Sequence, residues 1–169
     1  ASFQDIKKIR SFKTFNNSKF IEFPKSGLDE LKKINKKILK LGGCILIIDY
    51  GYLKPNNQNT LQSVMRHRKN KLLSHLGQAD ITTQVNFNLL KEFFHQNKLK
   101  VKNIITQKDF LTNMGIMERA EIIAKKMKFS EKTNLYLRMK RLLSPRLMGS
   151  LFKVILAYKH KNNYFYGFK

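Results

Sequence analysis

Cysteine and long apolar runs are scarce in this sequence, which argues against a disulfide-stabilised, zinc-binding or membrane-spanning protein. Cys44 is the one cysteine among 169 residues, which excludes a disulfide framework and argues against a cysteine-based zinc site. The longest apolar run, Cys44–Ile48, is far shorter than the ~20 residues that a membrane-spanning helix needs. The first residues, ASFQDIKKIR, contain neither an initiator methionine nor an apolar signal-peptide core. We therefore expect a chain that starts inside a longer protein and has no membrane span.

Acidic residues are also scarce. The chain carries 34 Lys and Arg against 11 Asp and Glu, a formal net charge of +23. Such an excess often marks nucleic-acid-binding proteins, so a basic, non-enzymatic nucleic-acid-binding module is one interpretation. However, 27 of the cations are Lys and only 7 are Arg, while Asn, Ile and Phe are abundant and Ala is rare, as AT-rich codon usage would produce. Because Arg is the preferred side chain for phosphate and base recognition, the composition favours a solvated lysine surface over nucleic-acid binding.

The common motifs for nucleotides and metals are missing. The sequence contains no GxxxxGK(S/T), GxGxxG, HExxH or CxxC. Its histidines, His67, His75, His95 and His160, are too dispersed for a ligand-spacing argument. We therefore expect no metal site, and we interpret Cys44 as a small buried hydrophobic residue rather than a nucleophile.

The clearest structural pattern is the segment Cys44–Ile48, which is continuously apolar and largely β-branched. Such a run is typical of a strand buried on both faces, as in a parallel sheet. Before it, apolar residues at helical spacing predict a helix that Ser26 and Asp29 cap and Gly42-Gly43 ends, which indicates an α/β fold. Asp49-Tyr50-Gly51 follows at the carboxyl end of the strand, where ligands bind in open α/β sheets. The expected inward residues of the helix are Leu28, Leu31, Ile34 and Ile38.

The rest of the chain predicts further helices and strands around one long irregular segment. Residues 52–85 show little regular pattern except a helical turn around Leu61 to Met65, and loops of that length are usually functional or disordered. We find no internal repeat or linker, so we treat the chain as one unit. The other expected elements are two short strands within Phe3–Phe23 joined by a turn at 16–18, a helix capped by Asn86 or Asn88, a strand over Val101–Thr106, a helix capped by Thr106 and Asp109 that carries Phe110, Met114, Met117 and Met127 inward, a helix capped by Ser130, and a strand over Leu151–Tyr158.

Five sequence blocks carry a resemblance to a known family. They are GGCILIIDYGY, NTLQSVMRHRK, GQADITTQVNF, TQKDFL and MGSLFKVILA. In this order and spacing they resemble the MidA-like family of S-adenosyl-L-methionine-dependent methyltransferases, whose mitochondrial members assist respiratory complex I assembly. Any single block is weak, but five in the right order are fairly specific, and the match runs from about Phe20 to Phe168.

The resemblance implies which part of the fold this chain represents. Family members are longer, and their glycine-rich cofactor loop, acidic residue and Asn-Glu motif lie upstream of the matched blocks. The chain would be the distal half of a class I, Rossmann-like sheet with flanking helices, and 1–169 the C-terminal part of a single methyltransferase domain. Strand five would be Cys44–Ile48, and the last two strands would lie near Val101–Thr106 and Leu151–Tyr158, the last inserted antiparallel. The cofactor S-adenosyl-L-methionine would bind the full-length protein, and this segment alone would be inactive.

The resemblance also implies an acceptor and site residues. The mitochondrial relatives imply a protein acceptor such as arginine, in the cytoplasm of a bacterium or in the mitochondrial matrix of a eukaryote. A carboxylate must then orient the guanidinium. Our candidates are Asp49 and Asp80, although Asp49 could instead be a structural cap on the following loop. A pseudo-enzyme acting only in assembly is a further alternative. The family motifs add substrate-binding or cleft-lining candidates at Tyr50, Gly51, Gln62, His67, Arg68 and Thr82.

Overall fold

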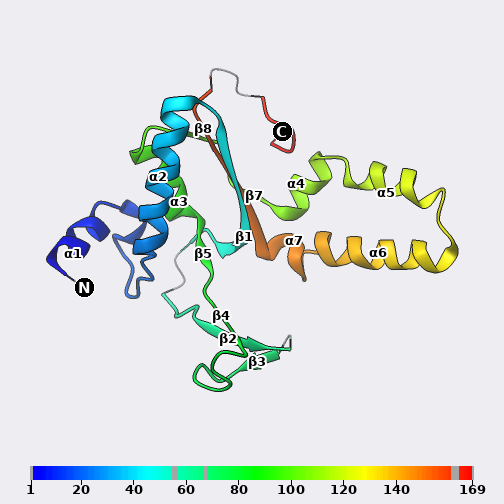
Figure 1. Cartoon of the computed structure of the whole chain (residues 1–169), viewed down its shortest axis with the longest axis horizontal. Coiled ribbons are helices and arrows are strands. Elements are labelled where there is room, and N and C mark those ends of the chain that lie inside the picture. Colours follow the sequence, from blue (N-terminus) through cyan, green and yellow to red (C-terminus); the bar gives the residue numbers. More distant parts are fainter. Residues whose placement is uncertain (1, 55–56, 67, 161–163, 169) are drawn as a thin grey trace.

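The computed structural model describes residues 2–54, 57–66, 68–160 and 164–168. A mixed sheet forms its centre, with helices α2 (Lys25–Leu41) and α3 (Phe87–Gln96) on one face (Figure 1). Four further helices, from α4 (Gln107–Asn113) to α7 (Met148–Leu151), extend from the other side. A small second sheet of strands β2, β3 and β4 projects away from this body. No helix among the described residues is long and apolar enough to cross a membrane.

The N-terminal segment is helical, so the prediction of two short strands there is wrong. Helix α1 (Phe3–Arg10) is followed by a short 3-10 helix, η1 (Lys13–Phe15). Ser2 and Asp5 form a reciprocal capping box that fixes the start of α1, and this local spacing decides the conformation of a short, ambiguous apolar pattern. The rings of Phe12 and Phe15 are then buried in the main core.

Two ion pairs join α1 to helix α2 (Lys25–Leu41). The amine of Lys25 lies 2.7 Å from a carboxylate oxygen of Asp5, and the amine of Lys8 lies 2.7 Å from that of Asp29. Lys25, helped by Ser2, lowers the pKa of the Asp5 carboxyl from 3.8 to about 2. A lowered pKa in the folded state means that the contact stabilises at pH values above the unfolded pKa, and that this contribution fades as the pH falls toward 2.

We therefore expect an NMR titration of the Asp5 carboxyl to give a midpoint of about 2, and Lys25→Gln to raise that midpoint toward 3.8. Lys33→Gln is the matched control, because the Lys33 amine contacts Glu30 on the same helix and not α1. An unchanged Asp5 midpoint in Lys25→Gln would show that this pair does not form in solution.

Helix α2 (Lys25–Leu41) confirms the predicted helix and its end at Gly42, whose φ is +81°. The start is different: Pro24 occupies the N-cap position without a side-chain cap, so the predicted cap by Ser26 and Asp29 is wrong. Ile34 is 43% exposed, whereas Asn35 is buried. Asn35 Nδ2 donates to the Asn97 carbonyl oxygen at 2.8 Å, whereas its buried Oδ1 has no hydrogen-bond partner among the described residues.

The central sheet has the order β5-β1-β8-β6, with β7 also paired to β8. Strand β1 (Cys44–Tyr52) runs antiparallel to β8 (Phe152–Tyr158), and its last two residues pair in parallel with β5 (Val85–Asn86). This confirms that the last strand is antiparallel and lies beside the strand at Cys44. The strand expected over Val101–Thr106 is two short pieces, β6 (Lys100–Val101) and β7 (Ile105–Thr106).

Strand β1 is not buried on both faces by the described residues, which corrects the expectation. Ile45 and Ile47 pack against the core below α2 and α3. On the opposite face Leu46 and Ile48 are 45% and 42% exposed, and Cys44 is exposed rather than buried. Before Gly51, the edge of β1 away from β8 has no partner strand in the described ranges. The sequence of β1 is apolar enough for a strand covered on both faces, but the described residues cover only the face of Ile45 and Ile47.

The helices that follow β5 differ from the prediction in two places. Helix α3 (Phe87–Gln96) begins as expected, with Asn86 as its cap, and the cap of Thr106 on Asp109 is confirmed. The single helix expected through Met127 is broken by Gly115, whose φ is +79°, so Met114 and Met117 are exposed and not core. Lys128 and not Ser130 stands at the N-cap of the next helix. These helices are α4 (Gln107–Asn113), α5 (Ile116–Ala124), α6 (Phe129–Leu143) and α7 (Met148–Leu151).

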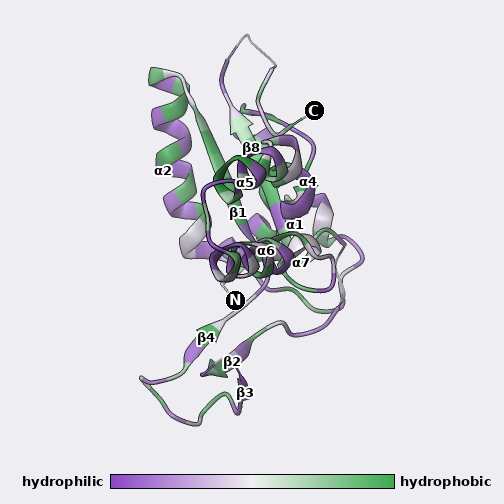
Figure 2. Ribbon diagram, turned by 90° about the vertical axis from the view of Figure 1, so that its right-hand side faces the viewer, coloured by the Kyte–Doolittle hydropathy of each residue, from purple (hydrophilic) through white to green (hydrophobic). Residues whose placement is uncertain are grey.

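Strands β2 (Gln62–Met65), β3 (Arg68–Asn70) and β4 (Asp80–Thr82) form an antiparallel sheet that we call the arm, together with the segment that joins β3 to β4. The helical turn expected near Leu61 to Met65 is therefore wrong. The strands are short, and β2 pairs with β4 across a long connection, so local periodicity carries little information about them. Both views show the arm extending away from the central sheet (Figures 1 and 2).

Candidate functional site

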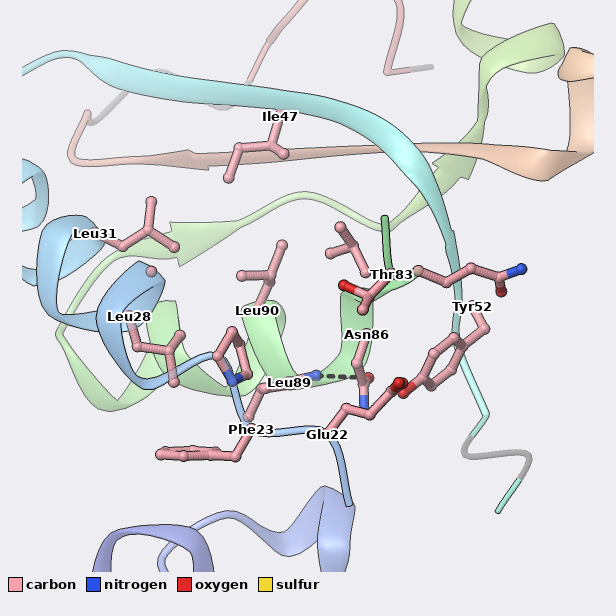
Figure 3. Close-up of a pocket in the computed structure, with 14 residues that line it drawn as sticks. Glu22, Phe23, Leu28, Leu31, Ile47, Tyr52, Thr83, Asn86, Leu89 and Leu90 are labelled. Carbon is pink, nitrogen blue, oxygen red and sulfur yellow. Dashed lines mark hydrogen bonds between the residues drawn. The ribbon is translucent and has the colours of Figure 1, made fainter. Parts of the chain in front are cut away.

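A pocket of about 440 Å³ opens beside the carboxyl end of β1. The first turns of α2 form one wall, β1 passes above the pocket and down the opposite side, and α3 lies below (Figure 3). Most of the lining is apolar, but Glu22, Tyr52 and Asn86 direct their polar ends toward one another at one side. The apolar walls come from Phe23, Leu28, Leu31, Ile47, Val85, Leu89 and Leu90.

Hydrogen bonds fix the carboxylate of Glu22 at the mouth of this pocket. The backbone N–H of Thr60 donates to Glu22 Oε1 at 3.0 Å, and the Thr60 hydroxyl donates to Oε2 at 2.7 Å. The same hydroxyl accepts the N–H of Gln84 at 3.0 Å. Three segments distant in sequence therefore meet at Thr60. Each Glu22 oxygen has accepted one hydrogen bond and keeps capacity for another.

Tyr52 and Asn86 form the other polar part of the pocket. Asn86 Oδ1 accepts the N–H of Leu89 at 3.1 Å, which orients the Asn86 side chain as the cap of α3. Its Nδ2 makes no hydrogen bond of good geometry to any described residue, although its interaction with the Tyr52 hydroxyl favours the ionised phenol. Burial, and then the charge of Glu22, outweigh that interaction and raise the pKa of Tyr52 above 10.0. At neutral pH the hydroxyl therefore stays protonated and can donate.

The sequence-predicted residues Asp49, Tyr50 and Gly51 lie on β1 but do not line this pocket. Asp49 Oδ1 accepts the N–H of Tyr50 at 2.8 Å, a contact within β1 and not a cap on a following loop. The ring of Tyr50 packs edge-on against Phe152 at 5.7 Å between centroids. Gly51 stands where β5 approaches β1 closely. The catalytic role of Asp49 stays a prediction.

The other candidates lie on the arm. Gln62 and Thr82 are direct partners across β2 and β4, so the structure brings these two together. Arg68 and Asp80 are both exposed, on β3 and β4 respectively. Among the described residues, no hydrogen bond or ion pair joins Asp49 to Asp80, the two predicted catalytic carboxylates. His67 lies outside the described residues.

Sequence reasoning missed the pocket residues Glu22, Tyr52 and Asn86 as a group. Asn86 was recognised only as a helix cap, and Glu22 stands in a segment interpreted as a strand. The observation that could have linked them is Thr60, which belongs to one of the five sequence blocks and binds Glu22. Thr60 has no apparent chemistry of its own, but it positions the carboxylate of Glu22.

The comparison with known families decides what kind of protein carries this pocket. Residues 2–105, more than half of the chain, match the model of a family of S-adenosyl-L-methionine-dependent methyltransferases. The chain belongs to this family. The family resemblance of the sequence blocks and S-adenosyl-L-methionine as the family cofactor are thereby confirmed.

Curated relatives are similar over most of this chain but are much longer. "Protein arginine methyltransferase NDUFAF7, mitochondrial" of Mus musculus is 30% identical over 132 residues, which cover 78% of this chain and 30% of the mouse protein. The Homo sapiens protein of the same name is 28% identical over 132 residues, with the same coverage. The chain thus spans less than a third of the length of these relatives.

Two solved structures from Burkholderia thailandensis share the fold. An uncharacterized protein aligns with 99% of this chain and 46% of its own at a TM-score of 0.78 and 20% identity. A second protein, bound to S-adenosyl-homocysteine, aligns with 83% of this chain and 38% of its own at a TM-score of 0.68 and 24% identity. The expected α/β, Rossmann-like fold is confirmed, and more than half of each neighbouring chain has no counterpart here.

The described residues do not fit the whole cofactor. β1 leads at its carboxyl end into the arm and not into a glycine-rich turn and helix. The paired glycines, Gly42 and Gly43, end α2 at the opposite end of β1. The carboxylate in the pocket, Glu22, is held by Thr60 and lies beside Tyr52 and Asn86, and apolar side chains form most of the remaining lining. The pocket therefore suits a ligand with an apolar stem and one polar head, and not a nucleoside with a charged tail.

Proposed function

We propose that this chain supplies the acceptor side of a methyltransferase and that the pocket holds an arginine side chain of a protein. The observation that carries the proposal is the pocket itself, which combines apolar walls with the half-buried carboxylate of Glu22 at the carboxyl end of β1. That edge of an α/β sheet is where substrates bind. The mouse and human relatives are named protein arginine methyltransferases, which supports arginine as the acceptor.

The pocket matches the two parts of an arginine side chain. Leu28, Leu31 and Leu90 offer an apolar surface for its methylene stem. Glu22 has one free acceptor position on each oxygen, which suits two parallel N–H donors of a guanidinium. Because Thr60 fixes the carboxylate, the guanidinium plane would be fixed as well, with its remaining nitrogen directed away from Glu22.

The chemistry asked of these residues is orientation and charge control. In this family S-adenosyl-L-methionine supplies an activated methyl group. A guanidinium nitrogen attacks well only when its lone pair is freed from the cation, and it must lose one proton during methylation. Glu22 would compensate the cation and take one proton from a nitrogen that it binds, which leaves a neutral guanidine with a lone pair on the far, attacking nitrogen. That proton would pass from Glu22 to solvent after the transfer, and the apolar walls would exclude water during it. Tyr52, neutral at physiological pH, would donate a hydrogen bond without adding charge.

The direct test uses protein expressed from the complete reading frame, isotope-labelled S-adenosyl-L-methionine, and two peptides that differ only in one Arg or Lys. We expect label on the Arg peptide and an at least ~10-fold lower rate on the Lys peptide, because the carboxylate fork matches a planar guanidinium. Label on both peptides alike would overturn the arginine pocket. Cofactor binding with transfer to neither would instead support the assembly-factor pseudo-enzyme alternative.

A further inference from the structure

The arm carries apolar and cationic side chains that the described part of the chain leaves exposed. Leu73 is 85% exposed, Leu76 69% and Ile81 56%, although the arm is an ordered sheet with Ser63 buried in it. These apolar side chains share the arm with exposed cations, and Figure 2 shows hydrophobic and hydrophilic stretches alternating along its outer loop. The arm's exposed cations are Arg66, Arg68, Lys69 and Lys71.

The arm carries more positive than negative charge, because Asp80 at the start of β4 is its one carboxylate against four exposed cations. From Met65 to Ala79 the sequence contains no Asp or Glu. The ion pairs found among the described residues all lie on α1 and α2. Arg66, Arg68 and Lys69, with Met65, line an open hollow of about 540 Å³ at the β2–β3 turn. A cationic hollow beside exposed leucines is complementary to an acidic segment that also carries apolar side chains.

We infer that the arm is a docking surface for an acidic, leucine-containing segment of the acceptor protein. The identity of this partner rests on the proposed function. The arm's return strand β4 continues through Thr83 and Gln84, which line the pocket, so a segment bound along the arm is held next to the pocket mouth. Docking outside the pocket would raise the local concentration of the acceptor side chain.

Other occupants fit these observations less well. Single-stranded nucleic acid is held largely by stacking on aromatic side chains, and residues 62–82 contain no Phe, Tyr or Trp. A second copy of a chain with a net charge of +23 would bring cations against cations. An anionic bilayer would match the charge and the leucines, and it enters the test as a competing outcome.

Binding can be measured apart from catalysis. The probe is a fluorescein-labelled 12-residue peptide of alternating Glu and Leu, titrated by anisotropy into protein from the complete reading frame. The arm variants are Leu73→Ser with Leu76→Ser, and Lys69→Gln with Lys71→Gln. Matched controls are Leu137→Ser on α6, where the leucine is 58% exposed, and Lys36→Gln with Lys37→Gln on the exposed face of α2.

We expect each arm variant to weaken binding by about 10-fold or more and each control by less than about 2-fold. Equal binding by arm and control variants would overturn the docking surface. So would leucine-dependent binding to vesicles of 70% phosphatidylcholine and 30% phosphatidylserine without peptide binding, or tighter binding of an oligothymidine. If the peptide binds the arm but arginine is not methylated, the proposed function is wrong and the docking surface stands. If arginine is methylated but the peptide does not bind the arm, the docking surface is wrong and the proposed function stands.

Discussion

Gly51→Ala is expected to destabilise the fold by about 3 kcal/mol or more, because an added methyl group has no room there. A Cβ at this position would lie 2.1 Å from the Val85 carbonyl oxygen and 2.8 Å from Phe87 Cε2. The carbonyl cannot move freely, since Gly51 and Val85 are paired where β1 meets β5. Phe87 is fully buried at the start of α3 and is equally constrained.

Gly27→Ala is the control for this prediction. A Cβ there would lie 3.8 Å from Pro24 Cβ, an ordinary contact, and Gly27 stands inside helix α2. Since Ala favours a helix over Gly by up to about 1 kcal/mol, Gly27→Ala should be neutral or stabilising. Urea unfolding of both variants gives the comparison. A Gly51→Ala loss no larger than that of Gly27→Ala would mean that β5 does not approach β1 in this way.

Gly51 also illustrates how far the sequence could be interpreted. The apolar pattern correctly located β1, and the family resemblance correctly implied that the last strand lies antiparallel beside it. Neither could show why a glycine follows Tyr50, because the reason is a strand and a helix more than thirty residues later. The sequence supported only a cleft-lining interpretation of Gly51, whereas the structure supplies a packing requirement.

Errors in the predicted fold arose where a distant or neighbouring contact outweighed a local pattern. Ile34 and Asn35 both stand near the apolar stripe of α2, and the amide is buried because Asn97, 62 positions away, accepts its hydrogen bond. The strands of the arm are three or four residues long, and their pairing is specified by partners across the arm. At the N-terminus the capping box of Ser2 and Asp5 was the decisive pattern and was overlooked.

The candidate site was predictable in its location but not in its residues. The carboxyl end of β1 was expected to face ligand, and the pocket lies there. Glu22 could not be found by spacing, because its partner Thr60 is 38 positions away and its strand-like surroundings suggested nothing catalytic. Asp49 and Asp80 were chosen for their positions after a strand and in a loop, and neither lines the pocket.

Glu22→Gln is therefore expected to produce the largest loss of activity, lowering kcat/KM on an arginine peptide by ~10²-fold or more. The substitution keeps the size of the side chain but removes the charge that would pair with the guanidinium. It also presents an amide N–H₂ to one of the two donors of Thr60, so orientation suffers as well. Thermal unfolding must accompany the kinetics, because a loss of folded protein would also lower the rate.

Asp49→Asn and Asp80→Asn, measured in the same assay, separate the sequence-based candidates from the pocket. Asn at position 49 can still accept the N–H of Tyr50, so a purely structural Asp49 predicts near-normal turnover per folded molecule. Thr60→Val removes the hydroxyl that fixes Glu22 and should reproduce part of the Glu22→Gln defect in kcat, since it loosens the carboxylate without removing its charge. If Asp49→Asn or Asp80→Asn abolishes turnover while Glu22→Gln does not, the acceptor binds at the strand end or at the arm, and the pocket of Glu22 is not its site.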